Sequence, residues 1–485
     1  MLNIIVYTII VMTIKYEFIN RERELEYFDE EYEKGDFRFI SVIGRRRLGK
    51  TRLIREFLED KSDFCYLLIP ELNDEEVRLE IAANFHDKFG LSFLGIPSWD
   101  ELFEKIFQLS EKKRLILIFD EFQRFFDINK SIFSYLQKQI DNYAAGSKLF
   151  LIVSGSSIGM MHRIFDYAAP LYGRRTGQLS FEPFGFYALK EWFPNLSPVQ
   201  RVHTYAIYGG TPKYLEEVEH KTLADSLNKI LSRTSLLYSE PETLLKTEVQ
   251  DSNTYFNIMK VIASGTTTPS EIAISSGIKS TSIDYFLTVL RNDLDLICRE
   301  TPVCEKKPTK KVIYLIKDNF FKFWFRFLYP NYSELEMGNT DLVLSKIEAE
   351  LDRFTGPAFE EITKQFLVAL NRQGKLPFTF GKIGKQWGKF RGETGKNIYE
   401  IDLAALNEST REILFCECKW QKQPVGKEVL EELAAKAKFV DWYRTERREY
   451  FVVMAREGFT EEAKRLAEGK GILLFSLTDL DLVNE

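Results

Sequence analysis

The sequence predicts an α/β protein whose N-terminal part, roughly residues 16–195, is a doubly wound parallel sheet. Three stretches carry this prediction, "FRFISVI", "KRLILIFDEF" and "SKLFLIVSG", which begin at residues 37, 113 and 147. The second and third are continuous apolar runs, as expected of strands that are buried on both faces of a parallel sheet. Strands that alternate with helices along the chain favour a doubly wound arrangement.

The first strand is followed by a glycine loop and then by an amphipathic helix. Leu53, Ile54, Phe57 and Leu58 recur at helical spacing in "TRLIREFLED", so one stripe of this helix is apolar and is expected to pack on the sheet. The order of strand, loop and helix predicts a site at the loop.

Length and composition bound the class of protein. The chain has 485 residues, of which 45% are hydrophobic and 28% are charged, so we expect two to four soluble globular domains. The net charge of −6 is small, and contact with nucleic acid would have to come from a local basic patch. Five cysteines without a C-x-x-C pair and four scattered histidines argue against structural zinc and predict a reducing cytoplasm.

The apolar start of the chain ends at Lys15 and is shorter than the roughly 20 residues that a spanning helix needs, so a membrane partner is not expected. Two alternatives stay open for this uncertain extension, residues 1–15. Translation starts at Met12, or the segment is a short strand or a peripheral anchor.

The rest of the chain is divided by its patterns. Three short helical segments in 254–293 precede two strand-like runs around a basic loop, which is the order of a winged helix. The aromatic run at 319–332 is expected to be a buried connector, because its rings recur at helical spacing. The predicted domains after the sheet are a helical lid (196–250), a winged helix (251–318), an aromatic linker helix (319–350) and a further α/β domain (351–485).

The loop "GRRRLGKT" at 44–51 fits the pattern of a phosphate-binding loop without a gap. Its glycines permit backbone angles that aim N–H groups at phosphate oxygens, Lys50 can reach the β- and γ-phosphates, and the Thr51 hydroxyl can ligate magnesium. The motif predicts ATP and Mg²⁺ as ligands. Predicted nucleotide-binding residues are Gly44, Arg45, Arg46, Arg47, Leu48, Gly49, Lys50, Thr51 and Arg52. The three consecutive arginines either add positive charge near the nucleotide or pair with acidic groups of a partner domain.

Polar residues end the next two predicted strands. Asp120 is predicted to hold the magnesium shell, and Glu121 to orient or deprotonate an attacking water. Ser154 and Ser156 either sense the γ-phosphate or simply begin a loop. Arg174, beside Arg175, is predicted to stabilise transferred charge, in its own chain or from a neighbouring subunit of a homo-oligomer.

A second candidate site lies in "NIYEIDLAALNESTREILFCECKW", residues 397–420, which is predicted to form a hairpin around 407–410. Glu417 and Lys419 are two apart and share a face of their strand, and Asp402 falls nearly opposite Glu417. Two carboxylates can bind Mg²⁺ while the lysine polarises water or phosphate. The alternative is an exposed hairpin with simple Glu–Lys pairing. The basic stretch 381–396 either meets a DNA backbone or is a solvated loop.

Five segments in order, "FINRERELEYF", "GRRRLGKTRLIREF", "LILIFDEFQ", "SGSSIGMM" and "YGGTPKYL", resemble the archaeal-type P-loop ATPases, a branch of the signal-transducing (STAND) and AAA+-like nucleotidases. The resemblance covers about residues 18–330. It implies that Asn20 and Arg21 lie near the adenine, and that Gly210 and Pro212 belong to a lid that reports the nucleotide state. In such relatives ATP acts as a conformational switch.

Asp402, Glu417, Cys418 and Lys419 resemble the core of PD-(D/E)xK restriction-endonuclease-like domains. The resemblance implies that Glu360 or Glu361 supplies a further acidic residue, and that Asp402, Glu417 and Lys419 are catalytic. The chain departs from the pattern at Ile401, which stands where the motif has proline.

Two functions follow from these observations. The first is an ATP-hydrolysing switch that controls a winged helix and a magnesium-dependent nuclease-like domain, in DNA processing or defence. The alternative is a regulatory or scaffold ATPase whose inactive nuclease-like domain binds a protein partner. The predicted recognition helix, residues 280–291, has acidic residues within and just after it and a poor charge balance for phosphate contact, so the winged helix is also interpreted as a packing module.

Overall fold

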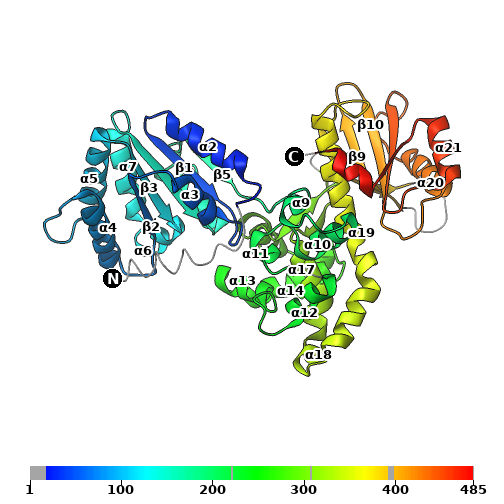
Figure 1. Cartoon of the computed structure of the whole chain (residues 1–485), viewed down its shortest axis with the longest axis horizontal. Coiled ribbons are helices and arrows are strands. Elements are labelled where there is room, and N and C mark those ends of the chain that lie inside the picture. The colour runs from blue at the N-terminus through cyan, green and yellow to red at the C-terminus, as the bar shows by residue number, and fades with distance from the viewer. Residues whose placement is uncertain (1–17, 220–221, 306–308, 391–397, 484–485) are drawn as a thin grey trace. The chain divides into compact units, whose positions relative to one another are not determined.

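The computed structural model describes residues 18–219, 222–305, 309–390 and 398–483 (Figure 1). The predicted extension at residues 1–15 and part of the basic stretch before residue 398 lie outside the described residues. The chain forms two compact units, one ending at Glu182 and the other beginning at Pro183, and each is described by itself. The predicted sheet domain, which ran to residue 195, therefore extends past the end of the first unit.

The first unit is built on a parallel sheet, which confirms the predicted fold class. Its strand order is β2-β3-β4-β1-β5, and each neighbouring pair is parallel. The strands are β1 (Arg38–Ile43), β2 (Phe64–Leu68), β3 (Leu115–Asp120), β4 (Leu149–Gly155) and β5 (Gly177–Ser180).

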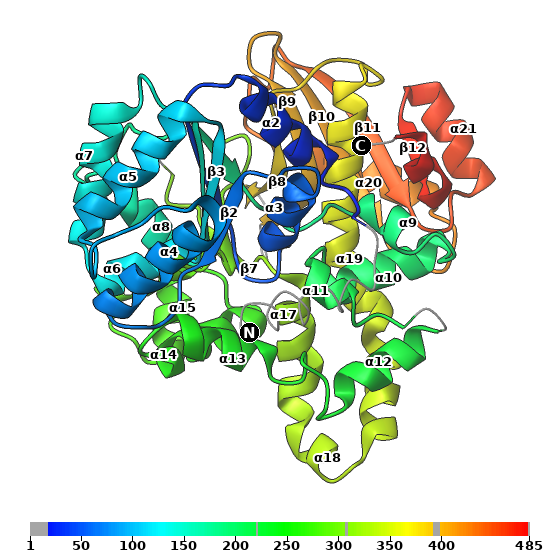
Figure 2. The same ribbon diagram turned by 60° about the vertical axis from the view of Figure 1, so that its left-hand side comes forward.

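Helices cover both faces of this sheet (Figure 2). On one face α2 (Glu22–Glu33) and α3 (Lys50–Leu58) enclose a core that contains Ile40, and on the other face a second core contains Phe39. Successive residues of a strand point to opposite faces, so a strand between two cores must be apolar throughout. The second face carries α4 (Asp74–Phe89), α5 (Trp99–Lys112), η1 (Phe122–Arg124), α6 (Phe125–Ile128), α7 (Ser131–Tyr143) and α8 (Ile158–Ile164).

The second unit begins with helices α9 (Ala188–Trp192), α10 (Pro198–Tyr208), α11 (Pro212–Leu215), α12 (Leu223–Leu231) and α13 (Glu240–Glu248). Helices α14 (Ser252–Ala263), α15 (Pro269–Ser276) and α16 (Ile283–Thr288) follow, and a π-helical turn η2 (Val289–Asp293) leads to an antiparallel pair of strands, β6 (Ile297–Glu300) and β7 (Ile313–Ile316). These elements come in the order that the sequence predicts for a winged helix. The assignment itself stays a prediction.

The aromatic segment is buried, which confirms its interpretation as a connector in the core. It forms α17 (Asn319–Phe323), a π-helical turn η3 (Trp324–Leu328), a 3-10 turn η4 (Tyr329–Asn331) and α18 (Tyr332–Glu336). Phe320, Phe321, Phe323 and Trp324 have no exposed surface. Such rings bury large apolar areas, so this segment anchors the helical part of the unit.

Helix α19 (Thr340–Arg372) runs without a break for 33 residues and crosses the predicted domain boundary at 350/351. Pro357 lies inside it, although proline removes a helix hydrogen bond. Buried positions such as Ile347, Leu351, Ala358 and Ile362 keep helical spacing on both sides of the proline. Burial of a continuous apolar face therefore outweighs the cost of the hydrogen bond that Pro357 removes. The domain boundary that the sequence predicts at 350/351 falls within this helix.

The C-terminal part of this unit is a mixed sheet with the order β12-β11-β10-β9-β8. Strands β8 and β10 are antiparallel to β9, and β11 and β12 continue parallel to β10. Helices α20 (Lys427–Ala437) and α21 (Glu461–Lys470) cover one face. The strands are β8 (Lys382–Lys389), β9 (Ile398–Asn407), β10 (Glu412–Lys419), β11 (Arg448–Ala455) and β12 (Leu473–Ser476), and η5 (Leu477–Leu482) follows them.

Candidate functional site

The phosphate-binding loop joins the carboxyl end of β1 to the start of α3. A Cβ atom on Gly44 would lie 2.6 Å from Cβ of Phe181 and 2.8 Å from its carbonyl oxygen, so no larger residue fits there. Gly49 has φ of 90°, in the left-handed region that glycine adopts without strain. The loop therefore needs both glycines, and it delivers the chain to a helix N-terminus, where backbone N–H groups attract anions.

Lys50 is folded back onto this loop. Its buried ammonium donates hydrogen bonds to the carbonyl oxygens of Gly44 at 2.6 Å and Arg45 at 2.8 Å. Phosphate oxygens are stronger acceptors for an ammonium than neutral carbonyls are. The lysine is thus held inside the loop, with weak partners that a phosphate can replace.

The arginines of the loop differ in their surroundings. Arg45 is buried, Arg46 is exposed and Arg47 is partly buried with φ of 71°. A left-handed arginine costs conformational energy, and such strain is concentrated at functional loops. Both roles that the sequence leaves open for the arginines stay predictions.

Thr51 and Asp120 meet at the carboxyl edge of the sheet. The Thr51 hydroxyl donates to Oδ2 of Asp120 at 2.9 Å, although 69 residues separate them. The Tyr66 hydroxyl, from the neighbouring strand β2, donates to the same oxygen. A hydroxyl and a buried carboxylate side by side are the oxygen ligands that Mg²⁺ prefers, so these residues fit the ion that ATP would bring. Sequence reasoning missed Tyr66, because only the strand pairing reveals its proximity.

Glu121 follows Asp120 with φ of 57° and turns its carboxylate toward β4. Ser156 donates to Oε2 of Glu121 at 2.7 Å, and the Gln123 amide donates to the same atom. Burial alone would raise the pKa of Glu121, but these two hydrogen bonds and the positive charges of Lys50 and Arg46 outweigh it and lower the pKa. Glu121 is therefore ionised at neutral pH, as a general base must be.

Of the two candidate serines, Ser156 contacts Glu121 and Ser154 does not. Ser154 is fully buried at the end of β4, and within the described residues its hydroxyl has no hydrogen-bond partner. The choice between a phosphate sensor and the beginning of a loop stays open for Ser154. Ser156 and Gln123 enter the site as partners of Glu121, which the sequence motif does not specify.

Arg21 lies beside the loop. Its guanidinium is 4.6 Å from the ring centroid of Phe181, the residue that packs on Gly44, and it donates to the carbonyl of Glu182 at 2.6 Å. Asn20 precedes it with φ of 54°. The predicted position of Asn20 and Arg21 at the adenine side remains a prediction.

Pro212 begins α11 in the second unit, so its contact with nucleotide stays a prediction. The neighbouring Gly210 is required by packing within that unit, because a Cβ atom there would lie 1.8 Å from the carbonyl oxygen of Phe184.

The structure does not bring Arg174 to the site in its own chain. The N–H of Thr176 donates to the carbonyl of Phe39, near the amino end of β1, whereas the phosphate-binding loop leaves the carboxyl end of that strand. Arg174 instead pairs with Asp141 of α7 at 3.0 Å. The prediction of a role in its own chain is corrected by this strand geometry. Donation to a neighbouring subunit stays a prediction.

The second candidate site is at the end of the β9–β10 hairpin, which the sequence predicted. Leu403 lies opposite Cys416, so Asp402 and Glu417 follow side by side. Asp402 accepts a hydrogen bond from the N–H of Cys418 at 2.7 Å. Burial, and then the charges of Glu417 and Glu360, raise the pKa of Asp402 to about 7.

Two lysines pair with Glu417, one of the carboxylates of this site. Oε1 of Glu417 lies 2.8 Å from Nζ of Lys419 and 3.1 Å from Nζ of Lys436, a residue of α20 that the sequence did not indicate. The other oxygen of Glu417 is buried and has no hydrogen-bond partner among the described residues. In the described part of the chain, no three His, Cys, Asp or Glu side chains are arranged to hold a metal ion.

The structure distinguishes the two acidic candidates on α19. Glu360 pairs with Lys385 of β8 at 2.6 Å, and burial raises the pKa of Glu360 while Lys385 opposes this effect. Glu361 points elsewhere, 3.5 Å from Lys364, and is 49% exposed. Glu360 is therefore the acidic residue that α19 adds beside Asp402.

Two segments of the sequence match known protein families. Residues 18–218 match a family model described as an ATPase domain predominantly from Archaea, and residues 324–436 match a family described as archaea bacterial proteins of unknown function. An uncharacterized protein of Methanocaldococcus jannaschii is 35% identical over 467 residues, which covers 95% of this chain and 99% of that protein. The chain belongs to this archaeal ATPase family.

Two further proteins are similar to parts of this family member. An ATP-binding protein of M. jannaschii is 46% identical over 53 residues, which are 10% of this chain and 90% of that protein. The solved structure of a Walker-type ATPase of Pyrococcus abyssi has a TM-score of 0.51 at 21% identity and covers 64% of this chain and 96% of that one. The latter likeness is one of fold.

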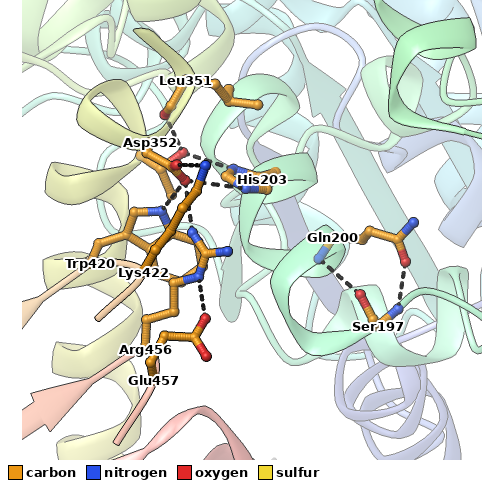
Figure 3. A network of polar contacts seen from close by, with 10 residues as sticks. Ser197, Gln200, His203, Leu351, Asp352, Trp420, Lys422, Arg456 and Glu457 are labelled. Carbon is orange, nitrogen blue, oxygen red and sulfur yellow. Dashed lines mark hydrogen bonds and ion pairs between the residues drawn. The ribbon is translucent and has the colours of Figure 1, made fainter. Parts of the chain in front are cut away.

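Within the second unit, a polar cluster links helix α10, which lies in the segment that matches the ATPase-domain model, to the C-terminal family segment (Figure 3). Asp352 of α19 accepts hydrogen bonds from Nε1 of Trp420 at 3.1 Å and from Arg456 at 2.8 Å, and Lys422 lies 3.0 Å away. His203 of α10 is 3.8 Å from Asp352. We call Asp352, His203, Trp420, Lys422 and Arg456 the Asp352 cluster.

His203 is buried against this cluster. Its ring packs edge-on against Trp420 with the centroids 5.3 Å apart, and its Nδ1 lies 3.0 Å from the Thr355 hydroxyl. Burial lowers the pKa of His203 to about 4, and the nearby cations Arg456 and Lys422 act in the same direction while Asp352 opposes them. The ring is therefore neutral at physiological pH.

The loop after β6 contacts the C-terminal sheet of the second unit. Val303 donates its N–H to the carbonyl of Lys385 at 3.0 Å, and the N–H of Cys304 donates to Oε1 of Gln386 at 3.1 Å. Lys385 sits at an irregularity of the β8–β9 register. The beginning of the loop between the two strands of the predicted winged helix thus packs against β8, which favours the interpretation of this region as a packing module.

Among the described helices, none is long and apolar enough to cross a membrane.

Proposed function

We propose that this protein hydrolyses ATP at the carboxyl edge of its parallel sheet. The observation that carries the proposal is the convergence of Lys50 and Thr51, at the start of α3, with Asp120 and Glu121, at the end of β3 and in the turn after it. Membership of the archaeal ATPase family supports it. The charge of Lys50 also acts on Glu121, so the lysine and the base belong to one electrostatic site.

Each residue has a defined task in the proposed reaction. Lys50 leaves the loop carbonyls for the β- and γ-phosphate oxygens, and the N–H groups at the start of α3 bind the remaining oxygens. Thr51 and Asp120 would hold Mg²⁺, which neutralises charge on the phosphates when bound. Glu121 takes a proton from a water molecule as the water oxygen attacks the γ-phosphorus. The bond from that phosphorus to the bridging oxygen breaks, and ADP leaves with the electron pair.

Phosphate release from ATP tests the proposal in the full-length protein. We expect Lys50→Ala to abolish turnover and to weaken nucleotide binding. Glu121→Gln should bind ATP and hydrolyse it about 10²–10⁴-fold more slowly, the range for loss of a general base. Lys112→Ala, an exposed lysine of the same unit, is the matched control. Turnover by Lys50→Ala at the rate of the unmodified protein would exclude the site.

A second proposed function is a switch, in which the nucleotide state acts on the C-terminal family segment. This segment would act either as a nuclease or as an inactive domain that binds a partner, and one observation supports each alternative. Asp402, Glu417 and Lys419 gather beside Glu360, which supports a magnesium-dependent nuclease acting in DNA processing or defence. Lysines already neutralise two of these carboxylates, Glu360 and Glu417, which supports an inactive domain that binds a protein partner.

Nuclease assays separate the two forms. Purified protein is incubated with single-stranded, duplex and branched DNA and with RNA, in Mg²⁺ or Mn²⁺, with and without ATP. Cleavage that disappears in Asp402→Asn and in Lys419→Ala, but persists in the control Lys470→Ala, an exposed lysine at the end of α21, supports a nuclease. Cleavage that survives both substitutions comes from a contaminant, and absence of cleavage leaves the partner-binding form.

A further inference from the structure

Tyr66 is a side chain of the candidate ATP site that the sequence did not indicate. It lies on β2, opposite Ile118 of β3, and Leu68 lies opposite Asp120. Residues 66 and 68 face the same side of the sheet, as do 118 and 120, so Tyr66 shares the face of Asp120. That face is covered by α3, whose second residue is Thr51. Strand pairing therefore places the phenol beside the Thr51–Asp120 pair.

Three donors, one each from α3, β2 and the turn after β3, fix the Asp120 carboxylate. The hydroxyls of Thr51 and Tyr66 donate to Oδ2, and the backbone N–H of Glu121 donates to Oδ1 at 3.1 Å. Asp120 is only 5% exposed, so these protein donors take the place of water. Two of the three belong to residues with another task, since Thr51 is a candidate metal ligand and Glu121 the candidate base. Only Tyr66 has no other evident role.

We infer that Tyr66 is a positioning residue, which fixes the orientation of Asp120 for Mg²⁺ during ATP hydrolysis. The inference rests on the proposed function and deepens it. When the Thr51 oxygen is engaged by the cation, Tyr66 continues to hold Oδ2, so the carboxylate does not rotate away. Partners of this kind, which orient a metal ligand without touching the metal, typically change metal affinity or activity about 10–100-fold when removed.

The chemistry of the phenol suits this task. Burial, then the charge of Asp120 and the hydrogen bond to it, raise the pKa of Tyr66 far above its ordinary value, so it stays a donor at any working pH. Arg55 lies 6.0 Å from the ring centroid and opposes this shift only in part. A role in packing alone would need the ring and not the hydroxyl, and this difference makes the inference testable.

Tyr66→Phe removes only the hydroxyl. Tyr143→Phe is the matched control, because its hydroxyl donates to a carboxylate of the same unit, Glu104, at 3.0 Å. Binding of a fluorescent, non-hydrolysable ATP analogue is measured in EDTA and then during a Mg²⁺ titration, and ATP turnover is measured against Mg²⁺ concentration. The thermal unfolding midpoint checks that each variant is folded.

We expect Tyr66→Phe to raise the half-saturating Mg²⁺ concentration about tenfold or more in both titrations, the lower end of the range for such partners. Its analogue affinity in EDTA should equal that of the unmodified protein and of Tyr143→Phe. An unchanged Mg²⁺ midpoint overturns the inference, and so does an equal loss of affinity with and without Mg²⁺, which indicates a structural role. Since the binding titration requires no turnover, a protein that binds the analogue in a Mg²⁺-dependent way without hydrolysing it contradicts the proposed hydrolysis and still tests Tyr66.

Discussion

At the residue scale, the state of Glu121 determines when the proposed ATP site can act. Its carboxylate accepts hydrogen bonds from Ser156 and Gln123, and both interactions lower its pKa. A carboxylate stabilised in this way is a weaker base than one with fewer donors. The two donors therefore set how strongly Glu121 attracts a proton from water.

Ser156→Ala tests this balance through pH. Loss of the hydrogen bond should raise the pKa of Glu121 toward its ordinary value, so at acidic pH a larger fraction is protonated and cannot act as base. We expect the acidic limb of kcat/KM for ATP hydrolysis to shift to higher pH, with little loss on the plateau. Ser157→Ala is the control, because that serine caps its helix without a side-chain hydrogen bond. Identical acidic limbs for both variants would contradict this account of Glu121.

Residues of a local motif were predictable and their distant partners were not. Lys50 and Thr51 are adjacent in the loop, and Asp120 and Glu121 end a continuous apolar run, so spacing alone indicated them. Tyr66 reaches the site only through strand pairing. Lys385 and Lys436 reach the second site from β8 and α20, on separate stretches of sequence with no pattern that links them. The role of Arg174 in its own chain failed because the sequence pattern does not reveal β5, the short strand that follows Arg174 and pairs in parallel with β1.

At the element scale, helix α19 connects the helical part of the second unit to the C-terminal sheet. Its face packs against the sheet through contacts such as Phe366 with Phe475, whose ring centroids are 5.0 Å apart. It also carries Asp352 into the Asp352 cluster and Glu360 to the second candidate site. The β9–β10 hairpin was predictable from alternation and turn residues. The continuity of α19 was not, because Gly356 and Pro357 ordinarily end a helix.

Asp352→Asn should destabilise the protein. The substitution keeps the size of the side chain but removes the charge that Arg456 and Lys422 contact. Because the Asp352 side chain is 35% exposed, we expect a loss of about 1–2 kcal/mol in the free energy of unfolding, below that of a fully buried charged hydrogen bond. Denaturant unfolding followed by tryptophan fluorescence measures it. Glu348→Gln, at an exposed position of the same helix, should leave the free energy of unfolding almost unchanged. Equal losses of free energy of unfolding in Asp352→Asn and Glu348→Gln would show that the Asp352 cluster does not stabilise the fold.

His203 predicts how stability depends on pH. Its pKa is about 4 in the folded protein and 6.5 as the ordinary value, so the unfolded chain binds a proton more readily between these values. Stability is therefore lost as pH falls from about 6.5 toward 4, by at most about 1.4 kcal/mol per pH unit. Asp352, whose pKa is lowered below its ordinary 3.8 because hydrogen bonds and cations outweigh burial, stays ionised in this window.

His203→Gln should flatten this dependence, since glutamine does not titrate. Free energies of unfolding at several values between pH 4.5 and 7.5 measure the slope in both proteins. Below pH 6.5 the free energy of unfolding should depend less steeply on pH in the variant than in the unmodified protein. Above pH 6.5 the two proteins should show the same dependence on pH. Parallel curves throughout would show that His203 keeps its ordinary pKa in the folded protein.

At the scale of the whole molecule, the limits of the sequence family and of the compact units differ. The ATPase family model extends to residue 218, whereas the first compact unit ends at Glu182. Helices α9 to α11 therefore lie within the segment that matches the ATPase-domain model, but they pack as part of the second unit. Through His203 of α10, this segment contacts Trp420, which directly follows the candidate catalytic Lys419. A change in nucleotide state that moves α10 would also displace His203. The Asp352 cluster would then transmit this displacement to Trp420 and to the neighbouring Lys419 of the second candidate site.

Hydrogen exchange can detect such coupling without any assumption about nuclease activity. In the unmodified protein, we expect the ATP analogue with Mg²⁺ to change amide exchange in the phosphate-binding loop, in α10 and in residues 419–425. Asp352→Asn should bind the analogue with unchanged affinity and keep the response in the loop and α10, but lose it in residues 419–425. Lys50→Ala should lose all three responses, and Glu348→Gln should keep them. A response at 419–425 that persists in Asp352→Asn would show that coupling travels by another route, because the cluster has then lost the charge that holds its parts together while the signal still arrives.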